Sequence, residues 1–289
     1  MTMPINRPLP ALFVSHGSPM MALEPGDTGA FLCQLGQTLD REWGRPKAVL
    51  AVSAHTTARS PVLLGGAKHE AIYDFGGFPQ PLYELRYDAP GAPALAQQLS
   101  ERLNAPVLDR GGLDHGIWTA LRYLYPDADV PVLPLALTPM ASPVELMALG
   151  EQLAGLANDG VLVLATGSIT HNLRLLMTQR PWGGTPREHD AEMPESAAFR
   201  DWFAARSGER DWDALSHYRV QAPHAVLMHP TDEHLLPWFV AAGVGGRDTA
   251  PRRIFEAVTF GCLGMDAYAF GPQAAALQAA VTQGQPQSA

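Results

Sequence analysis

Cysteine is scarce in this chain of 289 residues. Only Cys33 and Cys262 occur, far apart in the sequence, and there is no CxxC pair. Two distant cysteines exclude a disulfide-built scaffold, a cysteine-rich zinc site and a dithiol redox centre. We therefore expect both thiols to be packing residues.

Positive charge is also in short supply. The chain has 20 Lys and Arg against 29 Asp and Glu, a formal net charge of −9 and a pI of about 5.5. Binding to a nucleic-acid backbone needs clustered basic side chains, so nucleic acid is not an expected partner. No apolar run approaches the ~20 residues that span a bilayer, and the first residues lack the regions of a secretion signal. We expect a cytoplasmic protein without a membrane partner.

Several nucleotide and nucleophile motifs are missing as well. There is no G-x-S-x-G elbow, no GxGxxG and no P-loop. The stretch GDTGAF has the wrong spacing, and GVGGRD follows an expected helix instead of preceding one. Neither cysteine has a base close in sequence, and Ser18 lies in a proline-flanked turn. Nucleophilic catalysis and phosphate cradling are therefore poor interpretations of this chain.

What is present is enough apolar sequence for a large core. Hydrophobic residues make up 46% of the chain and charged residues 17%, without a linker-like stretch or an internal repeat. We expect one domain over residues 1–289, with a core from about 10 to 270 and a tail over 271–289 that adds one short helix. Apolar or β-branched runs predict strands over Ala11–Ser15, Ala48–Ser53, Val62–Leu64, Val130–Leu137, Val161–Thr166, Ile254–Thr259 and Met265–Phe270.

Helical patterns alternate with these strands. They cover Thr28–Trp43, Ala92–Leu103, Ile117–Tyr125, Pro143–Ala157, Ala191–Ala205 and Asp232–Ala242. Strands that alternate with helices predict an α/β fold with a largely parallel central sheet flanked by helices, and the last two strands are close enough in sequence to pair antiparallel.

Histidines follow three of the apolar strands. Of the ten histidines, His16 and His55 come directly after expected strands and His171 comes a few residues after a third. In open α/β sheets the ligand crevice lies outside the carboxyl ends of the strands. A single histidine in such a loop is often bonded only to backbone, but three such placements together favour a shared site.

Two further segments supply candidates. In HPTDEHLLPWFVAAG, Thr231 is positioned to cap a helix with His234 in its first turn, and spacing does not choose among His229, Asp232, Glu233 and His234 as the group that faces the crevice. His115 follows a glycine-rich loop and precedes a helix, where it could also be a plain capping residue.

Clustered imidazoles with few thiols point to metal chemistry. Neutral imidazole is the commonest ligand for Zn, Fe, Cu and Ni, whereas Ca²⁺ and Mg²⁺ prefer oxygen ligands. Two or three imidazoles leave coordination positions open for a substrate. The pattern therefore predicts one catalytic divalent transition-metal or zinc ion per chain.

Six segments resemble a known family in order along the chain. The stretches ALFVSHGSPM, VSAH, YDFGGFPQPLYELRYDAPGAPALA, LDHGIWTALRYLYPDADVPV, ITHNLR and PTDEHLLPW are similar to those of the DODA-type extradiol aromatic ring-opening dioxygenases. This is the bacterial 4,5-DOPA dioxygenase branch of the class III extradiol, or LigB-like, superfamily. The resemblance runs from Pro10 to about Phe270.

The resemblance implies roles for individual residues. His16, His55 and His234 would hold the metal, and His171 would be the acid/base histidine beside it, or a fourth ligand when substrate is absent. His115 would line the pocket and act as a second catalytic residue that stabilises developing oxygen charge. Fe(II) is expected for oxygenase activity, although Zn(II) suits the same imidazoles. The expected substrates are a small aromatic diol such as DOPA and O2, and the ring would open next to the diol.

Other features bear on the substrate pocket and on the alternatives. Phe75, Phe78 and Trp118 are candidate contacts for an aromatic ring. Similar proteins usually carry a bulky aromatic after the VSAH histidine, where this chain has Thr56 and Thr57, and residues 179–219 align least well. A zinc-dependent hydrolase and a non-catalytic interaction protein on the same scaffold remain the alternatives, and the oligomeric state is not predicted.

Overall fold

Six strands form one sheet whose order differs from the order along the chain. A computed structural model describes residues 7–178 and 187–283. The sheet order is β7-β2-β8-β1-β12-β9, with β1 at Ala11–Ser15, β2 at Ala48–Ser53, β7 at Val132–Pro134, β8 at Val161–Gly167, β9 at Arg252–Phe255 and β12 at Ala267–Phe270. The first four strands in this order are parallel, and β12 pairs antiparallel with both β1 and β9. The predicted parallel sheet with an antiparallel C-terminal pair is therefore confirmed.

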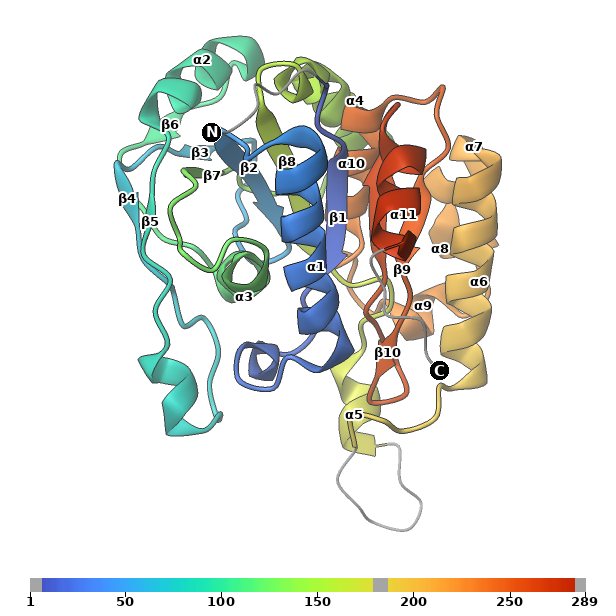
Figure 1. Cartoon of the computed structure of the whole chain (residues 1–289). Helices are drawn as coiled ribbons and strands as arrows, with labels where there is room; N and C mark the ends of the chain where they lie inside the picture. The colour runs from blue at the N-terminus through green and yellow to red at the C-terminus, as the bar shows by residue number, and fades with distance from the viewer. Residues whose placement is uncertain (1–6, 179–186, 284–289) are drawn as a thin grey trace.

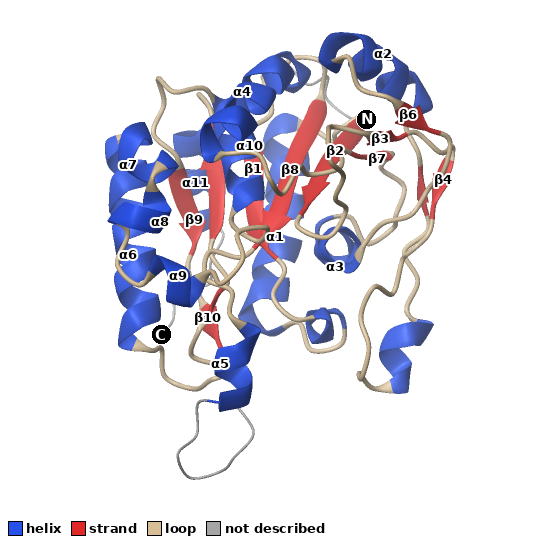
Figure 2. Ribbon diagram, turned by 180° about the vertical axis from the view of Figure 1, so that it is seen from behind, coloured by secondary structure: helices blue, strands red, loops and turns tan. Residues whose placement is uncertain are grey.

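Helices cover both faces of the sheet. Strands β1, β2 and β8 are buried along their whole length, as their uninterrupted apolar runs predict. Alternate side chains enter two separate cores, so that Phe13 belongs to one core and Leu12 to the other. One face is covered by α1 (Gly26–Trp43), α3 (His115–Leu124) and α11 (Ala274–Gln283), as Figure 1 shows. The opposite face, seen in Figure 2, is covered by α4 (Pro143–Leu153) and α10 (Leu236–Gly245).

The remaining elements are short or peripheral. They are the helices η1 (Pro19–Ala22), η2 (Gln80–Glu84), α2 (Pro93–Leu103), η3 (Ala154–Ala157), α5 (Leu173–Thr178), α6 (Pro194–Glu209), α7 (Trp212–Ser216), α8 (Tyr218–Gln221) and α9 (Ala225–Met228), and the strands β3 (Leu63–Leu64), β4 (Lys68–His69), β5 (Ala89–Pro90), β6 (Val107–Leu108), β10 (Val258–Thr259) and β11 (Leu263–Gly264). The expected tail helix is α11. No helix in residues 7–178 and 187–283 is both long and apolar enough to cross a membrane.

Several predicted strands are shorter than expected or lie in other sheets. The strand predicted over Val130–Leu137 shrinks to β7, because Pro131 and Pro134 carry no N–H group for the strand ladder. The strand predicted over Ile254–Thr259 divides into β9 and β10, which belong to different sheets. The short strand predicted near residue 63 pairs with β6 in a small sheet of its own.

Among the helix starts that differ from the predictions, those of α3 and α10 affect candidate residues. Helix α3 begins at His115 itself, because the Asp114 side chain caps it by accepting from the Ile117 N–H. Helix α10 begins at Leu236 instead of Asp232, and Thr231 does not cap it. Pro237 favours this later start, since its fixed φ and missing N–H suit the first helical turn. His234 therefore lies in the turn that precedes α10.

The parallel strands β1, β2 and β8 end at one edge of the sheet. Their order in the sheet, β2-β8-β1, places these three carboxyl ends side by side. Helix α5 and the hairpin of β10 lie at the same end of the molecule, the lower end in Figure 1. This edge is where a ligand crevice is expected in an open α/β sheet.

Candidate metal centre

Four histidines meet at this edge of the sheet. His16 follows β1, His55 follows β2, His171 follows β8, and His234 comes from the turn before α10. The ring centroids of His16 and His55 are 5.0 Å apart, those of His55 and His234 are 4.9 Å apart, and those of His16 and His234 are 5.5 Å apart. The structure thus brings together the residues that the sequence analysis singled out.

The closest donor atoms belong to His16 and His55, whose Nε2 atoms lie 3.0 Å apart. The hydroxyl of Thr166 donates to the carbonyl of Gly116 at 3.0 Å and lies 2.9 Å from Nδ1 of His16. Because this hydroxyl donates its only hydrogen to the carbonyl of Gly116, Nδ1 of His16 must be the donor in its bond to Thr166. The Nε2 atom of His16 is therefore unprotonated and directs its lone pair at His55.

Carboxylates fix two other rings in the same way. Nδ1 of His234 lies 3.2 Å from Oε1 of Glu233, and Nδ1 of His115 lies 2.9 Å from Oδ1 of Asp74. An ionised carboxylate only accepts, so both Nδ1 atoms donate, and in the neutral ring of His234 the Nε2 atom keeps a free lone pair. Metal-binding histidines commonly donate their second ring nitrogen in this manner.

His171 occupies a different position in the cluster. Its ring stacks on that of His234, with centroids 3.5 Å apart and planes 10° apart. Its backbone N–H donates to the carbonyl of Met228 at 2.9 Å, which holds the residue by its main chain. The ring lies against the cluster without sharing the carboxylate or hydroxyl partners that orient His16 and His234.

Burial keeps the clustered imidazoles neutral. It lowers the pKa of His16 well below its usual value, and the neighbouring His55 adds to the effect. Burial, followed by the nearby His171, also lowers the pKa of His234 well below its usual value. Burial and then His115 lower the pKa of His55 to about 4, and burial and then His229 lower the pKa of His171 to about 3. Neutral imidazole is the form that binds a metal.

Two sets of ligand atoms could each hold an ion. In the described part of the chain, His16, His55 and His115 offer nitrogens within 4.8 Å of one another, and so do the donor atoms of His171, Glu233 and His234. The two sets adjoin, because the ring of His16 is 5.5 Å from that of His234. Besides lining the pocket, His115 therefore lies close enough to His16 and His55 for its ring nitrogen to share an ion with theirs.

A cavity of about 560 Å³ opens onto the cluster. It is large enough for a small aromatic molecule. Phe75 and Phe78 line it, as predicted, but Trp118 is fully buried in the core, where its indole N–H donates to the carbonyl of Ile72. The other lining residues, besides the four histidines 55, 115, 171 and 234, are Gly17, Ser18, Pro19, Asp74, Leu173, Leu176, Glu233, Phe260 and Leu263.

The two threonines after His55 border a second cavity. Thr56 and Thr57 line a space of about 420 Å³ on which His55 also borders. The hydroxyl of Thr56 donates to the buried carboxylate of Asp114, which also accepts from the hydroxyl of Ser53. The small side chains at this point leave room beside His55 that a bulky aromatic would reduce.

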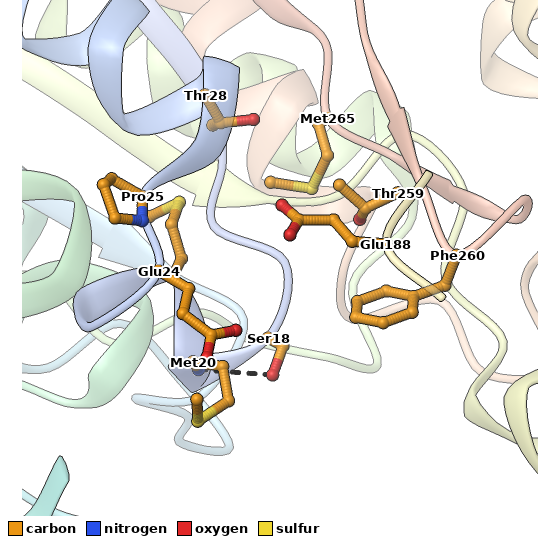
Figure 3. A pocket seen from close by; sticks show the side chains of 10 residues that line it. Ser18, Met20, Glu24, Pro25, Thr28, Glu188, Thr259, Phe260 and Met265 are labelled. Atoms are coloured by element: carbon orange, nitrogen blue, oxygen red, sulfur yellow. Dashed lines mark hydrogen bonds between the residues drawn. The ribbon is translucent and has the colours of Figure 1, made fainter. Parts of the chain in front are cut away.

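A much smaller space, of about 30 Å³, lies beside the main cavity (Figure 3). Figure 3 shows Thr259 and Phe260 on one side of it and Glu24 and Pro25 on the other. Phe260 and Ser18 line both spaces. The residues of the stretch 179–219 that the structure describes do not line the main cavity, and residues 179–186 lie outside the described part.

Sequence reasoning missed the residues that orient the histidines. Asp74 lies 41 positions from His115, and Thr166 lies 150 positions from His16. Asp74 lies in the stretch YDFGG and Thr166 in the stretch ATGS. Neither residue comes directly after a strand, so the pattern that identified the histidines does not identify them. Glu233 was one of four open alternatives, and it contacts His234 directly.

Comparisons with known proteins point to one family. Residues 10–271 match the family described as the catalytic LigB subunit of aromatic ring-opening dioxygenase. A 4,5-DOPA dioxygenase extradiol of Escherichia coli (strain K12) is 35% identical over 265 residues, which cover 89% of this chain and 93% of that protein. The protein of the same name from Beta vulgaris is 33% identical over 265 residues, covering 89% and 95%.

A solved structure has the same architecture. The crystal structure of an uncharacterized protein from Escherichia coli K12 superposes with a TM-score of 0.70 at 29% identity, covering 91% of this chain and all of that one. The family match covers most of the chain and includes every histidine of the cluster. The chain therefore belongs to the LigB family of aromatic ring-opening dioxygenases.

Proposed function

We propose that the protein is a metal-dependent extradiol dioxygenase that uses O2 to open the ring of a catechol, such as DOPA, next to its two hydroxyls. The observation that carries the proposal is the 3.0 Å separation of the His16 and His55 Nε2 atoms. Two nitrogens that are each about 2.1 Å from one ion lie about 3.0–3.4 Å apart. The relatives named 4,5-DOPA dioxygenase extradiol support the choice of substrate class.

We propose that His16, His55 and His234 hold the ion. The rings of His16 and His234 are already held with the correct nitrogen free, since Thr166 and Glu233 accept from their Nδ1 atoms. Such fixed tautomers remove the reorganisation that ion binding would otherwise need. His171 could act as a fourth ligand when no substrate is present, because its ring lies against that of His234.

The ion supplies the chemistry that side chains lack. When bound, Fe(II) supplies Lewis acidity toward the substrate hydroxyls and an accessible redox state for the reaction with O2, whereas Zn(II) fits the same imidazoles but has a filled d shell. We therefore propose Fe(II) as the ion of the active enzyme, and expect Zn(II) to give a bound but inactive form.

The protein handles the protons and positions the ring. His171 is neutral at physiological pH, because burial lowers its pKa to about 3, and its ring serves as a base for a substrate hydroxyl only when a nearby charge raises that pKa. The nearby carboxylate of Glu233 favours the protonated ring that results. Phe75, Phe78 and Phe260 offer apolar faces to an aromatic ring in the cavity. His115 is held by Asp74 and lines the same cavity.

The organisation of the chain supports a single catalytic unit. The main cavity is lined by residues from Gly17 to Leu263, so we propose that residues from about 10 to 270 form one catalytic domain. We propose that this unit acts on small molecules in the cytoplasm without nucleic acid or membrane. The net charge of −9 supports the absence of a nucleic-acid partner, since it disfavours contact with phosphate backbones.

The test is a metal-loading experiment. Protein freed of metal by a chelator is loaded anaerobically with Fe(II) and then given air and L-DOPA, and O2 uptake and a yellow ring-cleavage product are recorded. We expect both signals with Fe(II) and neither with Zn(II) or without metal. Ester hydrolysis by the Zn(II) form would instead support a hydrolase, and the absence of both activities would support a non-catalytic binding protein.

A further inference from the structure

The second cavity, of about 420 Å³, has the size and the lining of a site for a small molecule. Its aliphatic lining residues are Ala58, Val62, Leu64, Ile72, Leu108 and Ala136. The rest of the lining consists of His55, Thr56, Thr57, Arg110 and Gly111. Among these described residues none is acidic, so Arg110 supplies the only permanent charge of an otherwise mostly apolar wall.

The side chain of Arg110 is available to a ligand. It is exposed, and no carboxylate within residues 7–178 and 187–283 pairs with it. The backbone N–H of Gly111 and the hydroxyl of Thr57 also have no hydrogen-bond partner in the part of the chain that the structure describes. A guanidinium that is followed by a free backbone N–H offers the donors from which a carboxylate accepts.

Buried contacts hold the main chain around Arg110. The N–H of Gly112 donates to Nδ1 of His69 at 3.0 Å, and the His69 side chain is fully buried. A side chain at Gly111 would lie 2.0 Å from the carbonyl oxygen of Lys68, so only glycine allows this close approach. Two of the residues that line the second cavity are therefore carried by a backbone with fixed neighbours.

The second cavity adjoins the proposed metal centre but is separate from it. His55 is the one described residue that lines both this cavity and the main cavity. The segment after His55 is tied down, because the hydroxyl of Thr56 donates to the buried carboxylate of Asp114 and its carbonyl accepts from the N–H of Leu137 at 2.9 Å. A molecule in the second cavity can therefore lie against this segment without entering the main cavity.

We propose that the second cavity binds a small carboxylate with a compact apolar body. The apolar body displaces water from the aliphatic wall, and the carboxylate pairs with Arg110. An alcohol of the same skeleton keeps the apolar contact but lacks the ion pair, whereas an amine brings a like charge to Arg110. This binding site goes beyond the proposed function and does not depend on the reaction at the metal centre.

The experiment compares three molecules that share one skeleton. They are 3-phenylpropanoate, 3-phenylpropan-1-ol and 3-phenylpropylamine, and calorimetry on the Zn(II)-loaded full chain gives the Kd of each. We expect the carboxylate to bind most tightly and the alcohol to bind about three- to fivefold more weakly, the effect of one exposed ion pair. The amine should bind more weakly than the alcohol.

Two variants locate the site. Arg110→Gln removes the charge, so it should weaken the carboxylate to the level of the alcohol and leave the Kd of the alcohol unchanged. Thr57→Phe places a bulky ring in the second cavity and should weaken both molecules severalfold. Because Arg110 and Thr57 are exposed and their side chains have no described partner, neither change removes a bond that holds the fold.

Each variant has a matched control. Arg41→Gln removes a guanidinium that pairs with Glu42 on the surface of α1, far in the sequence from the second cavity, and should keep the Kd of the carboxylate. Leu173→Phe places a bulky ring in the main cavity instead, where Leu173 is 53% exposed, and should also keep that Kd.

Three results would overturn the proposal. If the carboxylate does not bind, the second cavity is not a site for this class of molecule. If the three molecules bind equally, or if Arg110→Gln keeps the preference for the carboxylate, Arg110 does not select a negative charge. If Leu173→Phe weakens the carboxylate and Thr57→Phe does not, the molecule occupies the main cavity. None of these results depends on whether the Fe(II) form opens a catechol ring.

Discussion

The ring of His171 lies flat on the ring of His234, with 3.5 Å between the centroids and 10° between the planes. His234 is fixed by Glu233, which accepts from its Nδ1 atom. His171 is held by its main chain instead, through the bond of its N–H to Met228, and the neighbouring Asn172 side chain donates to the carbonyl of Leu227. This difference supports the proposal that His234 binds the ion while His171 exchanges protons.

Replacing His171 should separate catalysis from metal binding. His171→Gln keeps a polar side chain of similar length but removes the base, so kcat should fall about 10²- to 10⁴-fold, the usual contribution of general acid/base catalysis. Metal content should stay near that of the wild type, because His16, His55 and His234 are untouched. Elemental analysis and O2 uptake on the same preparation measure the two effects.

The His171→Gln variant is compared with variants of two proposed metal ligands and of one distant histidine. His16→Ala and His55→Ala each remove a proposed ligand and should lose most of the metal. His217→Gln changes a ring that is 60% exposed and outside the cluster, so it should keep both metal and activity. Should His171→Gln release its ion as readily as His16→Ala does, His171 is a ligand first and a base second.

The hydroxyl of Thr166 offers a milder perturbation of the same site. Thr166→Val preserves shape but leaves Nδ1–H of His16 without its acceptor, 2.9 Å away in the wild type. Loss of such a partner typically weakens metal binding about 10- to 100-fold, and competition with a chelator dye should show this shift in Kd. Thr138→Val is the control, since its buried hydroxyl has no partner within the described residues and its loss should leave the affinity unchanged. Equal affinities in the two variants would contradict the proposed tautomer of His16.

Sequence predicts best the buried strands and the histidines at their carboxyl ends. Strands β1 and β2 match their predicted bounds, because each is an uninterrupted apolar run that ends at a polar residue. The histidines after them gather because the carboxyl ends of neighbouring parallel strands share an edge. The gathering of His16, His55 and His171 thus results from local pattern and one rule of topology.

Other features depend on contacts that local pattern does not encode. The start of α10 is decided by Pro237 and by the bonds of Leu235 and Leu236 to Asp232, which outweigh the capping signal at Thr231. Asp74 reaches His115 only because the loop before η2 folds back over the start of α3. Such pairings are set by tertiary packing, so spacing along the chain carries no trace of them.

Buried His229 should make stability depend on pH. Its Nε2 atom donates to the carbonyl of Ile169 at 2.7 Å, and burial lowers its pKa to about 4 even though that bond opposes the lowering. In the unfolded chain the pKa returns to about 6.5, so the unfolded state binds more protons between these values. The stabilisation is complete above pH 6.5 and declines as the pH falls toward 4, by about 2 kcal/mol between pH 7 and pH 5.

His229→Gln should remove this share of the pH dependence. The glutamine amide can still donate to Ile169 but does not titrate, so the free energy of unfolding should fall less steeply between pH 7 and pH 5 than in the wild type. Urea denaturation of chelator-treated protein at several pH values measures the slope. His224→Asn alters an exposed ring at a φ of +56° that asparagine tolerates, and it should keep the wild-type slope. If the free energy of unfolding depends on pH equally steeply in the wild type and in His229→Gln, His229 does not contribute to the pH dependence.

Phe260 is held in a conformation that suits a smaller residue. It is the first of the three residues, Phe260 to Cys262, that connect β10 and β11; its φ is +55°, Gly261 follows at +71°, and the N–H of Cys262 donates to the carbonyl of Thr259. Turns with two positive φ values favour Asn-Gly, and a bulky residue there is strained by about 1–3 kcal/mol. The same turn presents the Phe260 ring to the main cavity and to the small space beside it (Figure 3).

A pair of substitutions should separate the strain from the function of the ring. Phe260→Asn and Phe260→Ala both remove the aromatic wall, so both should raise KM for a catechol severalfold. Only asparagine is at ease with the positive φ, so Phe260→Asn should be more stable than Phe260→Ala by about 0.5–1 kcal/mol in urea denaturation. Equal stability of the two variants would mean that the turn relaxes out of the left-handed region, and an unchanged KM would mean that the ring does not touch the substrate. We expect the change in stability because the backbone of Phe260 is strained, and the change in KM because its ring lines the cavity.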